Sequence, residues 1–558
     1  MTNYEIADQF SLLSKLMDIH GENSFKAKSY GVAAYNIEKL PKEISTMDDA
    51  ELFSIRGFGD SIGQKIREVQ HTGTMEALQQ ILEKTPVGVL EMMQVKGLGP
   101  KKIAVIWKEM TIESVGELEY ACNENRLVNY KGFGTKTQES ILQNIAFIRS
   151  NMGFHLWAEV ENIANLLLTQ LQRVNPGKLF ALGGAYRRQL PTIEHLDIVT
   201  TTDRAIIKQQ FGVTQGIAIE EQDQLLHIQA PNQPKIVVHT VANESAFYST
   251  LFHTSGSKDF IEAFTEKYKL PEALNSEEQI FSFNNLAYIH PAMREDRHVL
   301  GKAADNQLPA LIQVSDIRSI IHSHSVWSDG SNTLEHMAKA AIDKGYEYLV
   351  ISDHSQAAYY ANGLTPERIA AQHQEIDALN EKLAPFKIFK SIEADILSDG
   401  SLDYNTQVLS TFDLVIASVH SNLKMTQERA MERVMAAIHN PYTSILGHPT
   451  GRLLLSREGY PLDHKAIIDA CAAQNVVIEI NAHPRRLDLD WRWIEYALEK
   501  GVLLSIDPDA HAIEGYHDVY YGVLAGQKGG LTADRNLSSF SLAQFEAFLK
   551  EQQAKRNR

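Results

Sequence analysis

The sequence predicts a chain of several domains: a helical N-terminal region, a central α/β domain and a C-terminal barrel of alternating strands and helices. A glycine motif recurs in the first 150 residues, and a strand–turn–strand pattern follows near residue 180. After residue 318, short apolar runs alternate with helical segments. At 558 residues the chain is well beyond the length of one ordinary domain.

The chain is expected to divide into five segments. Residues 1–85 and 86–150 are predicted to form two helical domains, and residues 151–300 an α/β domain with further helices. The polar stretch at 301–318 predicts a linker, and residues 319–558 are predicted to form the barrel.

Composition limits the classes of function. The net charge of −17 argues against a nucleic-acid binder driven by a basic surface, but not against one that holds phosphates through backbone amides and a few lysines. Cys122 and Cys471 are the only cysteines and lie far apart, so metal ligands have to be His, Asp or Glu. The first residues show no leader and no run could span a bilayer, which predicts a cytoplasmic protein.

The first 150 residues contain one glycine motif three times, each followed by an amphipathic helix. The copies are Gly57-Phe58-Gly59, Gly97-Leu98-Gly99 and Gly132-Phe133-Gly134, preceded by Arg56, Lys96 and Lys131 respectively. Glycine allows a positive φ and close approach of a partner, and the helix N-terminus favours an anion. The pattern resembles the helix-hairpin-helix, which grips a DNA backbone without reading sequence. The alternative is that these glycines only make tight turns between helices.

From Leu179 the chain reads LFALGGAYRRQLPTIEHLDIVTTT: a strand, a glycine turn, the pair Arg187-Arg188 and a second strand. This order resembles the nucleotidyltransferase palm of family X DNA polymerases. With the glycine motifs before it and KDFIEAFTEKY after it, the resemblance covers about the first 315 residues.

The predicted palm departs from the family where catalytic metals would bind. The family carries two aspartates on the second strand and a third on a later strand, and these hold two metals for phosphoryl transfer. Here the pair reads His195-Leu196-Asp197, and His239 stands at the third position. Because Mg²⁺ prefers oxygen ligands, templated polymerisation is expected to be lost or severely weakened. His195, Asp197 and His239 could instead hold a softer metal.

Lys65 lies near the start of the helix after Gly59. Family X polymerases of the β type carry there a lysine that forms a Schiff base and removes deoxyribose phosphate. A solvated lysine, or one that contacts phosphate, is the interpretation that we favour.

The C-terminal segment places histidines at the ends of its apolar runs, and KIFKSIEADI supplies a glutamate at the same position. Alternation of strands and helices favours a parallel barrel or a doubly wound sheet. His322 and His324 alternate and would face one side of a strand. In a β/α barrel the carboxyl ends of all strands meet at one face. One histidine would ordinarily cap a strand or helix, but so many at strand ends favour a multinuclear metal site.

This set resembles the PHP (polymerase and histidinol phosphatase) domain, a distorted (β/α)7 barrel that holds three metals, commonly Zn, Mn or Fe. The resemblance implies as metal ligands His322, His324, Asp329, His354, Glu393, His420, His448, Asp509 and His511. Catalysis is assigned to Glu393, His322, His324 and Asp509, with Glu393 expected to bridge two metals.

Five further residues near the strand ends have less certain roles. Asp353 and Asp507 are expected to orient ligating imidazoles. His483, Arg452 and Arg485 are candidates for contact with substrate phosphate, against a plain surface role.

Hairpins, palm and PHP domain together are the arrangement of bacterial family X DNA polymerases. In that family the PHP domain is a Mn²⁺-stimulated 3′–5′ exonuclease, with related cleavage at abasic sites, in base-excision repair. The resemblance implies a monomeric, metal-dependent phosphoesterase that trims gapped, nicked or free DNA 3′ ends without sequence preference. The alternatives are an active gap-filling polymerase, a non-enzymatic scaffold that binds DNA ends, and a small-molecule phosphatase.

Overall fold

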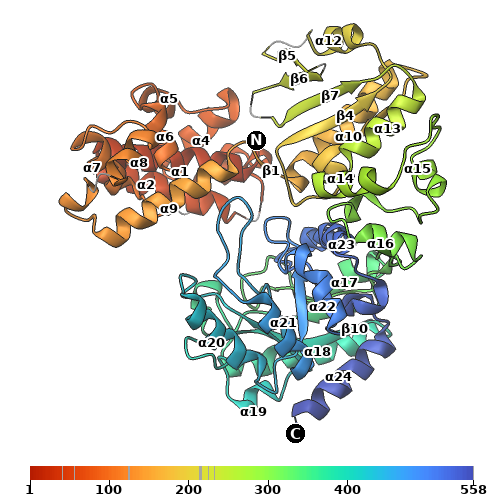
Figure 1. Cartoon of the computed structure of the whole chain (residues 1–558). Helices are drawn as coiled ribbons and strands as arrows, with labels where there is room; N and C mark the ends of the chain where they lie inside the picture. Colours follow the sequence, from red (N-terminus) through yellow and green to blue (C-terminus); the bar gives the residue numbers. More distant parts are fainter. Residues whose placement is uncertain are drawn as a thin grey trace. The chain divides into compact units, whose positions relative to one another are not determined.

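The computed structural model describes residues 1–40, 42–55, 57–123, 126–212, 216–223, 225–231 and 233–556. The chain divides into two compact units, Met1–Met152 and Gly153–Arg558 (Figure 1). Arg56, which precedes the first glycine turn, lies outside the described residues. No helix in the described ranges is long and apolar enough to cross a membrane. The limits predicted for the five smaller segments stay predictions.

The first unit is built from helices. Their bounds are α1 (Asn3–His20), α2 (Ser24–Glu38), α3 (Asp49–Ser54), α4 (Asp60–Thr72), α5 (Glu76–Leu82), α6 (Val87–Met92), α7 (Pro100–Lys108), α8 (Val115–Asn123) and α9 (Thr135–Asn151). Helix α1 begins at a capping box, in which the Thr2 hydroxyl and the Glu5 carboxylate each accept from the other residue's backbone amide. The buried face of α1 packs on α2, where the rings of Phe10 and Tyr30 meet edge to face at 5.9 Å.

The three glycine motifs adopt one geometry. The first glycine of each motif, Gly57, Gly97 or Gly132, has φ between +91° and +98°, the left-handed region that favours glycine. The apolar residue between the glycines is buried in every copy. The second glycine immediately precedes α4, α7 or α9. The amide-bearing N-terminus of each of these helices therefore follows directly on the turn.

The basic residues predicted beside the turns lie on or next to these helices. Lys96 and Lys131 are exposed. Lys65 lies in the second turn of α4, where its ammonium is 3.4 Å from the Glu68 carboxylate and its side chain is partly buried. The role of Lys65 stays a prediction.

The second unit begins with a five-stranded mixed sheet of order β2-β4-β7-β6-β5. The elements of this region are β1 (His155–Leu156), α10 (Trp157–Val174), β2 (Phe180–Leu182), α11 (Gly184–Arg187), β3 (Thr192–Ile193), β4 (His195–Thr200), α12 (Arg204–Gly212), β5 (Ala218–Gln222), β6 (Leu225–Gln229) and β7 (Lys235–Thr240). Strand β4 pairs with β7 in parallel and with β2 in antiparallel fashion, so the predicted strand–turn–strand is present.

A small helical region follows the sheet. Its helices are α13 (Glu244–Thr254), α14 (Lys258–Lys267), α15 (Glu278–Phe283) and α16 (Val299–Ala304). Phenylalanine side chains from the first three of these helices form its core, and the rings of Phe252 and Phe264 meet at 4.8 Å. The guanidinium of the fully buried Arg294 lies 5.0 Å from the Phe281 ring centroid. Both oxygens of the buried Glu277 carboxylate accept hydrogen bonds from Arg294 and from Arg187.

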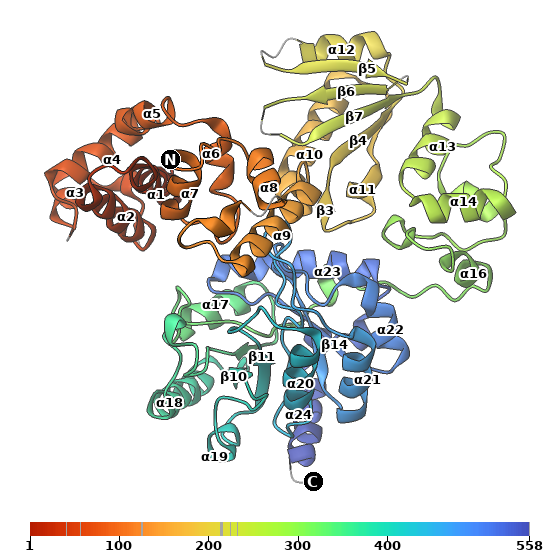
Figure 2. The same ribbon diagram turned by 60° about the vertical axis from the view of Figure 1, so that its left-hand side comes forward.

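The rest of the unit is a nearly closed barrel of seven parallel strands in the order β14-β13-β12-β11-β10-β9-β8 (Figure 2). Its strands are β8 (Ser319–Ile320), β9 (Tyr348–Ile351), β10 (Lys387–Asp395), β11 (Leu414–Ser418), β12 (Ile445–Leu446), β13 (Val477–Asn481) and β14 (Leu504–Asp507). Its α-helices are α17 (Leu334–Asp343), α18 (Pro366–Leu383), α19 (Thr406–Leu409), α20 (Gln427–Ile438), α21 (His464–Gln474), α22 (Ile494–Glu499), α23 (Val519–Lys528) and α24 (Leu542–Arg556). The strands are buried on both faces, as a sheet covered by helices requires.

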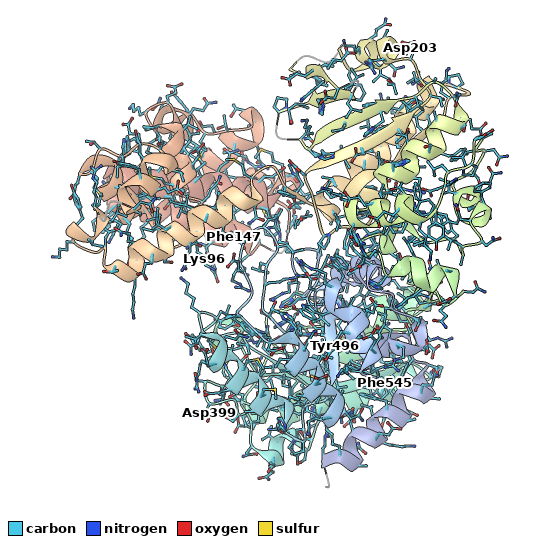
Figure 3. The ribbon with its side chains drawn as sticks, viewed as in Figure 1. Lys96, Phe147, Asp203, Asp399, Tyr496 and Phe545 are labelled. Carbon is cyan, nitrogen blue, oxygen red and sulfur yellow. The ribbon has the colours of Figure 1, made fainter. Side chains whose placement is uncertain are left out.

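Helix α24 covers the amino end of this barrel. Phe545, labelled in Figure 3, stacks on Tyr348 at 4.6 Å and meets Phe389 at 4.9 Å. Tyr348 is the first residue of β9, and the first residues of β11 and β13 belong to the same apolar cluster. Because apolar side chains fill the amino end of the barrel, its carboxyl end is the one available for a functional site.

The buried Glu277 carboxylate generates a prediction about stability. Burial alone would raise the pKa of Glu277, but the Arg187 and Arg294 guanidiniums lower it from 4.5 to about 2. We expect Glu277→Gln to lower the free energy of unfolding by about 3–5 kcal/mol, because two buried cations lose their anion. Since the folded pKa lies below the unfolded one, the stabilisation is complete above pH 4.5 and disappears as the pH falls toward 2.

Urea denaturation at pH 7 and at pH 3 measures this effect. As a control, Asp469→Asn removes an exposed ion pair with Lys500 and is expected to lower the free energy by less than about 1 kcal/mol. Equal losses in the two variants would contradict the role given to Glu277.

Candidate metal centre at the carboxyl end of the barrel

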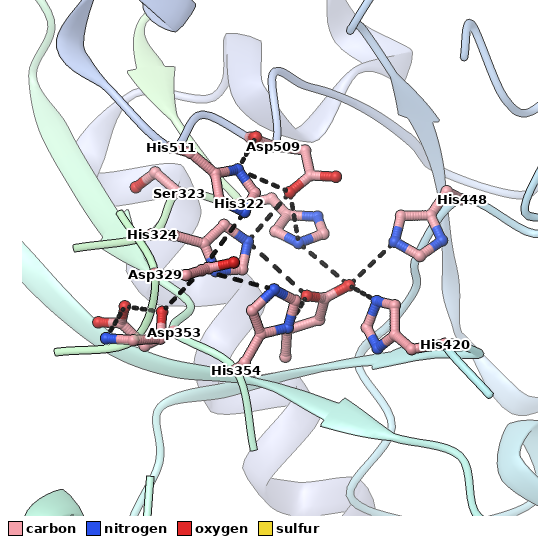
Figure 4. Close-up of polar contacts among 12 residues, drawn as sticks. His322, Ser323, His324, Asp329, Asp353, His354, His420, His448, Asp509 and His511 are labelled. Carbon is pink, nitrogen blue, oxygen red and sulfur yellow. Dashed lines mark hydrogen bonds and ion pairs between the residues drawn. The ribbon is translucent and has the colours of Figure 1, made fainter. Parts of the chain in front are cut away.

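The carboxyl end of the barrel gathers all nine side chains expected there as ligands (Figure 4). His322 and His324 follow β8, and His354 follows β9. Glu393 lies near the end of β10. His420 and His448 follow β11 and β12, Asp509 and His511 follow β14, and Asp329 comes from the loop after His324. Parallel strands bring these positions to one face although they span 190 residues of sequence.

Glu393 lies at the middle of the group and is completely buried. Its Oε1 atom is 3.0 Å from Nε2 of His420, 3.0 Å from Nε2 of His448 and 3.3 Å from Nε2 of His322. Its Oε2 atom is 2.9 Å from Nδ1 of His354 and 3.7 Å from Nε2 of His324. One carboxylate therefore faces five imidazoles, which is the placement expected of a bridge between metals.

Two further carboxylates complete the group. Asp509 Oδ1 lies 3.0 Å from His324 Nε2 and 3.5 Å from His322 Nε2. Asp329 Oδ1 lies 3.5 Å from His511 Nε2 and 3.7 Å from His354 Nε2. Among the described residues, three overlapping clusters could hold a metal ion: His324/Asp329/His354/His511, His322/His324/Asp509 and His354/Glu393/His420. His448 belongs to none of these clusters, but contacts Glu393.

Buried ring nitrogens of this group lack aligned hydrogen-bond partners. These atoms are His322 Nε2, His324 Nδ1, His354 Nδ1 and His448 Nδ1, together with Glu393 Oε2. A buried polar atom without a partner is unfavourable, and a cation placed among such donors would satisfy several of them at once. The donor set of nitrogen and oxygen atoms suits Zn²⁺, Mn²⁺ or Fe²⁺. The residues present therefore fit a metal centre.

The pKa shifts point the same way. Burial, with the neighbouring His511 and His354, lowers the pKa of His324 to about 3. Burial also opposes protonation of His420, but Glu393 and Asp395 outweigh it and raise its pKa to about 10. Burial raises the pKa of Glu393, yet the surrounding imidazoles hold it well below its ordinary value. The raised pKa of His420 and the lowered pKa of Glu393 both result from the close pairing of imidazoles with carboxylate oxygens in this buried group.

Several supporting residues were missed from the sequence. Glu479 Oε2 accepts from Nδ1 of His322 at 2.6 Å, and Asp395 accepts from Nδ1 of His420. Both bonds hold the imidazole so that Nε2 faces Glu393. Each carboxylate stands in an otherwise apolar strand end, VVIEIN or IEADI, and that signal could have identified it.

A third missed residue is Arg486, whose Nε lies 3.9 Å from Asp509 Oδ2. Arg452 does not reach the centre, because Asp490 and the carbonyls of Arg486 and Leu487 hold its guanidinium. Arg485 is largely exposed, 3.5 Å from Glu159. The arginine that contacts a predicted ligand is therefore Arg486, and not Arg452 or Arg485, which the sequence suggested.

The two aspartates expected to orient imidazoles do something else. Asp353 accepts from the amides and hydroxyls of Ser325 and Ser328 and from the Gln372 amide. It thereby shapes the loop between His324 and Asp329. Asp507 accepts from Ser505, and burial raises its pKa. The expectation that Asp353 bonds to an imidazole was wrong, because backbone, hydroxyl and amide donors occupy its oxygens, whereas Oδ2 of the buried Asp507 has no hydrogen-bond partner.

The palm residues come together in a different arrangement. Asp197 Oδ1 is 2.7 Å from Nε2 of His239, and its Oδ2 is 3.2 Å from Nε2 of His195. Burial would raise the pKa of Asp197, but these two hydrogen bonds lower it. None of the metal clusters found among the described residues includes these three. Arg187 is held by Glu277, and Arg188 by Glu295 at 2.9 Å.

The hydrogen bond between Glu479 and His322 generates a prediction. Glu479 Oε1 already accepts from the His448 amide and from Asn481, so the NH2 group of a glutamine would face His322 Nδ1. Nδ1 would then accept, and the ring proton would move to Nε2, which faces Glu393. We expect Glu479→Gln to lower metal affinity about 10- to 100-fold.

Equilibrium dialysis against Mn²⁺ or Zn²⁺, followed by elemental analysis, measures this affinity. Glu546→Gln, which removes a surface ion pair with Lys387, is the control and is expected to bind metal as the wild type does. Unchanged affinity in both variants would show that the tautomer of His322 is not set by Glu479.

Comparison with known proteins agrees with this architecture. Residues 1–75 match the helix-hairpin-helix domain family, and residues 321–483 match the PHP domain family. A probable phosphatase of Thermoanaerobacter sp. strain X514 is 26% identical over 249 residues, which cover 42% of this chain and 95% of that protein. A probable phosphatase of Caldanaerobacter subterraneus is 29% identical over 169 residues, 29% of this chain and 60% of that protein.

One relative matches along the whole chain. The DNA polymerase/3′–5′ exonuclease PolX of Bacillus subtilis is 33% identical over 577 residues, which cover 99% of this chain and 100% of that protein. The whole of this chain, from the helical hairpins to the barrel, therefore aligns with that one protein. The chain belongs to the bacterial family X DNA polymerases that carry a C-terminal PHP domain.

Proposed function

We propose that this protein is a DNA-binding, metal-dependent phosphodiesterase that removes nucleotides from 3′ ends at the carboxyl end of its barrel. The observation that carries the proposal is the buried Glu393 carboxylate with five imidazoles around it. Family membership and the exonuclease named in the Bacillus relative support it. The proposed ligands are His322, His324, Asp329, His354, Glu393, His420, His448, Asp509 and His511.

Three divalent cations, Mn²⁺, Zn²⁺ or Fe²⁺, are proposed at this site. When bound, such cations supply a hydroxide nucleophile near neutral pH and neutralise charge on the phosphoryl oxygens. The carboxylates of Glu393 and Asp509 would offset the positive charge of the bound cations. Glu479 and Asp395 fix the ring orientation of His322 and His420. No serine, threonine or cysteine nucleophile is needed.

Residues outside the ligand set position the substrate. The Arg486 guanidinium, beside Asp509, is placed to pair with a phosphate oxygen of the scissile nucleotide. In the first unit, the glycine turns before α4, α7 and α9 offer backbone amides, with Lys96 and Lys131 exposed beside two of them. Since these amides and lysines would contact only the sugar–phosphate backbone of DNA, we propose gapped, nicked or free 3′ ends of any sequence as substrates. We also propose that the protein acts as a monomer.

We further propose that the palm has lost templated polymerisation. Each oxygen of Asp197 is engaged by an imidazole, His195 or His239, so the carboxylate is neutralised from within the protein. Mg²⁺ needs several oxygen ligands, and imidazoles at these positions are poor substitutes. In this proposal the palm is retained as a folded part of the second unit without a catalytic role.

The first test of the proposal is digestion of 5′-labelled single-stranded and gapped DNA with Mn²⁺. We expect products that shorten from the 3′ end, and at least a 10³-fold loss of rate in His322→Ala/His324→Ala, because two ligands of the centre are removed. EDTA is expected to abolish the wild-type reaction.

Other outcomes identify the rival functions. DNA binding without digestion, in a protein that contains no metal, would favour a scaffold. Hydrolysis of small phosphomonoesters but not of DNA would favour a small-molecule phosphatase.

The palm is tested separately by incorporation of a labelled deoxynucleotide into gapped DNA with Mg²⁺. We expect no extension by the His322→Ala/His324→Ala variant, in which digestion cannot mask synthesis. Extension that disappears on further Asp197→Ala substitution would show that the palm is an active polymerase and would overturn this part of the proposal.

A further inference from the structure

A short loop at the mouth of the metal centre exposes two adjacent aromatic rings. This tyrosine loop, residues 356–363, begins two residues after His354 and contains the 3₁₀ turn Tyr359–Ala361. The Tyr359 side chain is 86% exposed and that of Tyr360 is 64% exposed. Among the described residues of the barrel, from 319 to 556, no other tyrosine, phenylalanine or tryptophan is exposed to this degree. Aromatic side chains elsewhere in this domain contribute to packing, and these two do not.

Hydrogen bonds fasten the tyrosine loop to both neighbouring ligand segments. The amide of Leu364 donates to the carbonyl of His354 at 2.9 Å, which closes the loop at its base. The Asn362 side-chain amide donates to the carbonyl of Ser328 at 3.2 Å, next to Asp329. Arg368 donates to the carbonyl of Asn362 at 2.7 Å. The loop is thus held at a defined place between His354 and Asp329, both labelled in Figure 4.

The orientation of the rings leaves them available to a ligand. The two tyrosine rings meet at 79° with centroids 6.1 Å apart, so they do not stack on each other. Partial burial raises the pKa of Tyr360 to about 12, to which Asp395, Glu393 and Asp329 contribute. The loop that carries Tyr360 is fastened to His354 and to the residue before Asp329, both beside the centre. Val326, between His324 and Asp329, is a further exposed apolar side chain at this mouth.

We propose that Tyr359 and Tyr360 are substrate-positioning residues that stack on the unpaired terminal bases of a DNA 3′ end. The inference rests on the proposed function, since it names the part of the substrate that this site recognises. Every base has an aromatic face, so stacking holds a strand without reading its sequence. The charged phosphate would lie toward the cations and Arg486, and the flat apolar base would lie toward the exposed rings. This division of contacts favours single-stranded ends, because the bases of a duplex are already stacked and paired.

The test compares Tyr359→Ala/Tyr360→Ala with Tyr359→Phe/Tyr360→Phe in the full-length protein. On a single-stranded oligonucleotide we expect the alanine variant to raise KM at least tenfold, and the phenylalanine variant to behave as the wild type. Phe283→Ala, which removes an aromatic ring that is 60% exposed on α15, is the matched control and is expected to have no effect. On an oligonucleotide whose last two residues carry no base, all four proteins should react alike.

A binding measurement without metal separates this inference from the proposed function. In EDTA, an oligonucleotide with 2-aminopurine at its 3′ end is expected to lose fluorescence on binding to the wild type, and to retain it with the alanine variant. If DNA is digested but the alanine variant matches the wild type in both measurements, the tyrosine inference is wrong and the proposed function stands. If quenching depends on the tyrosines but no DNA is digested, the stacking site is real and the proposed reaction is wrong. Equal losses on the base-carrying and base-free strands would mean that the alanines damaged the loop and not a stacking contact.

Discussion

The candidate metal centre depends on a short stretch of backbone pairing that links the two ends of the barrel sheet. The amide of His324 donates to the carbonyl of Ala510 at 2.8 Å, and Ser323 pairs with Ala510 in parallel. This contact joins the segment after the first barrel strand to the segment after the last. Each segment carries two ligands separated by one residue, so its closure brings together side chains that are nearly 190 positions apart. Without it, neither Asp509 nor His511 would reach the imidazoles of the other end of the sheet.

The same region stores backbone strain. His322, His448 and Asp509 have φ of +58°, +23° and +52°, in the left-handed region that residues with a Cβ rarely adopt. Such conformations cost on the order of 1 kcal/mol or more each and persist where the surrounding contacts determine them. Here the surrounding contacts are the closed barrel and the carboxylates Glu393 and Glu479. Strained backbone, ring nitrogens without aligned hydrogen-bond partners and buried charged groups occur together at this place. A bound cation would compensate for them.

The two candidate active sites of the second unit illustrate opposite uses of histidine. In the barrel, Nε2 atoms of His322, His324, His420 and His448 converge on Glu393 from several strands, and three overlapping clusters of His, Asp and Glu could hold a metal ion. In the palm, two imidazoles engage the two oxygens of Asp197, and the carboxylate is satisfied within the protein. The difference between the two sites lies in how many ligands converge on the central carboxylate.

Much of this protein was determined by the sequence alone. The glycine repeat, the strand–turn–strand of the palm and the histidines at strand ends are local patterns, because backbone conformation and strand alternation depend on neighbouring residues. They predicted the helical hairpins and a parallel barrel or doubly wound sheet. The resemblance to the PHP domain, which rests on the same histidines, implied the (β/α)7 barrel and the nine candidate ligands that lie together at its carboxyl end.

The tertiary structure alone decided which groups support that set. Glu479, Asp395 and Arg486 contact partners 23 to 157 residues away in the sequence, and Asp353 bonds to a loop instead of an imidazole. The exposure of Tyr359 and Tyr360 likewise has no local signal, since burial is set by how distant elements cover a side chain. These residues take their roles from long-range packing, and the spacing of residues along the chain does not reveal that packing.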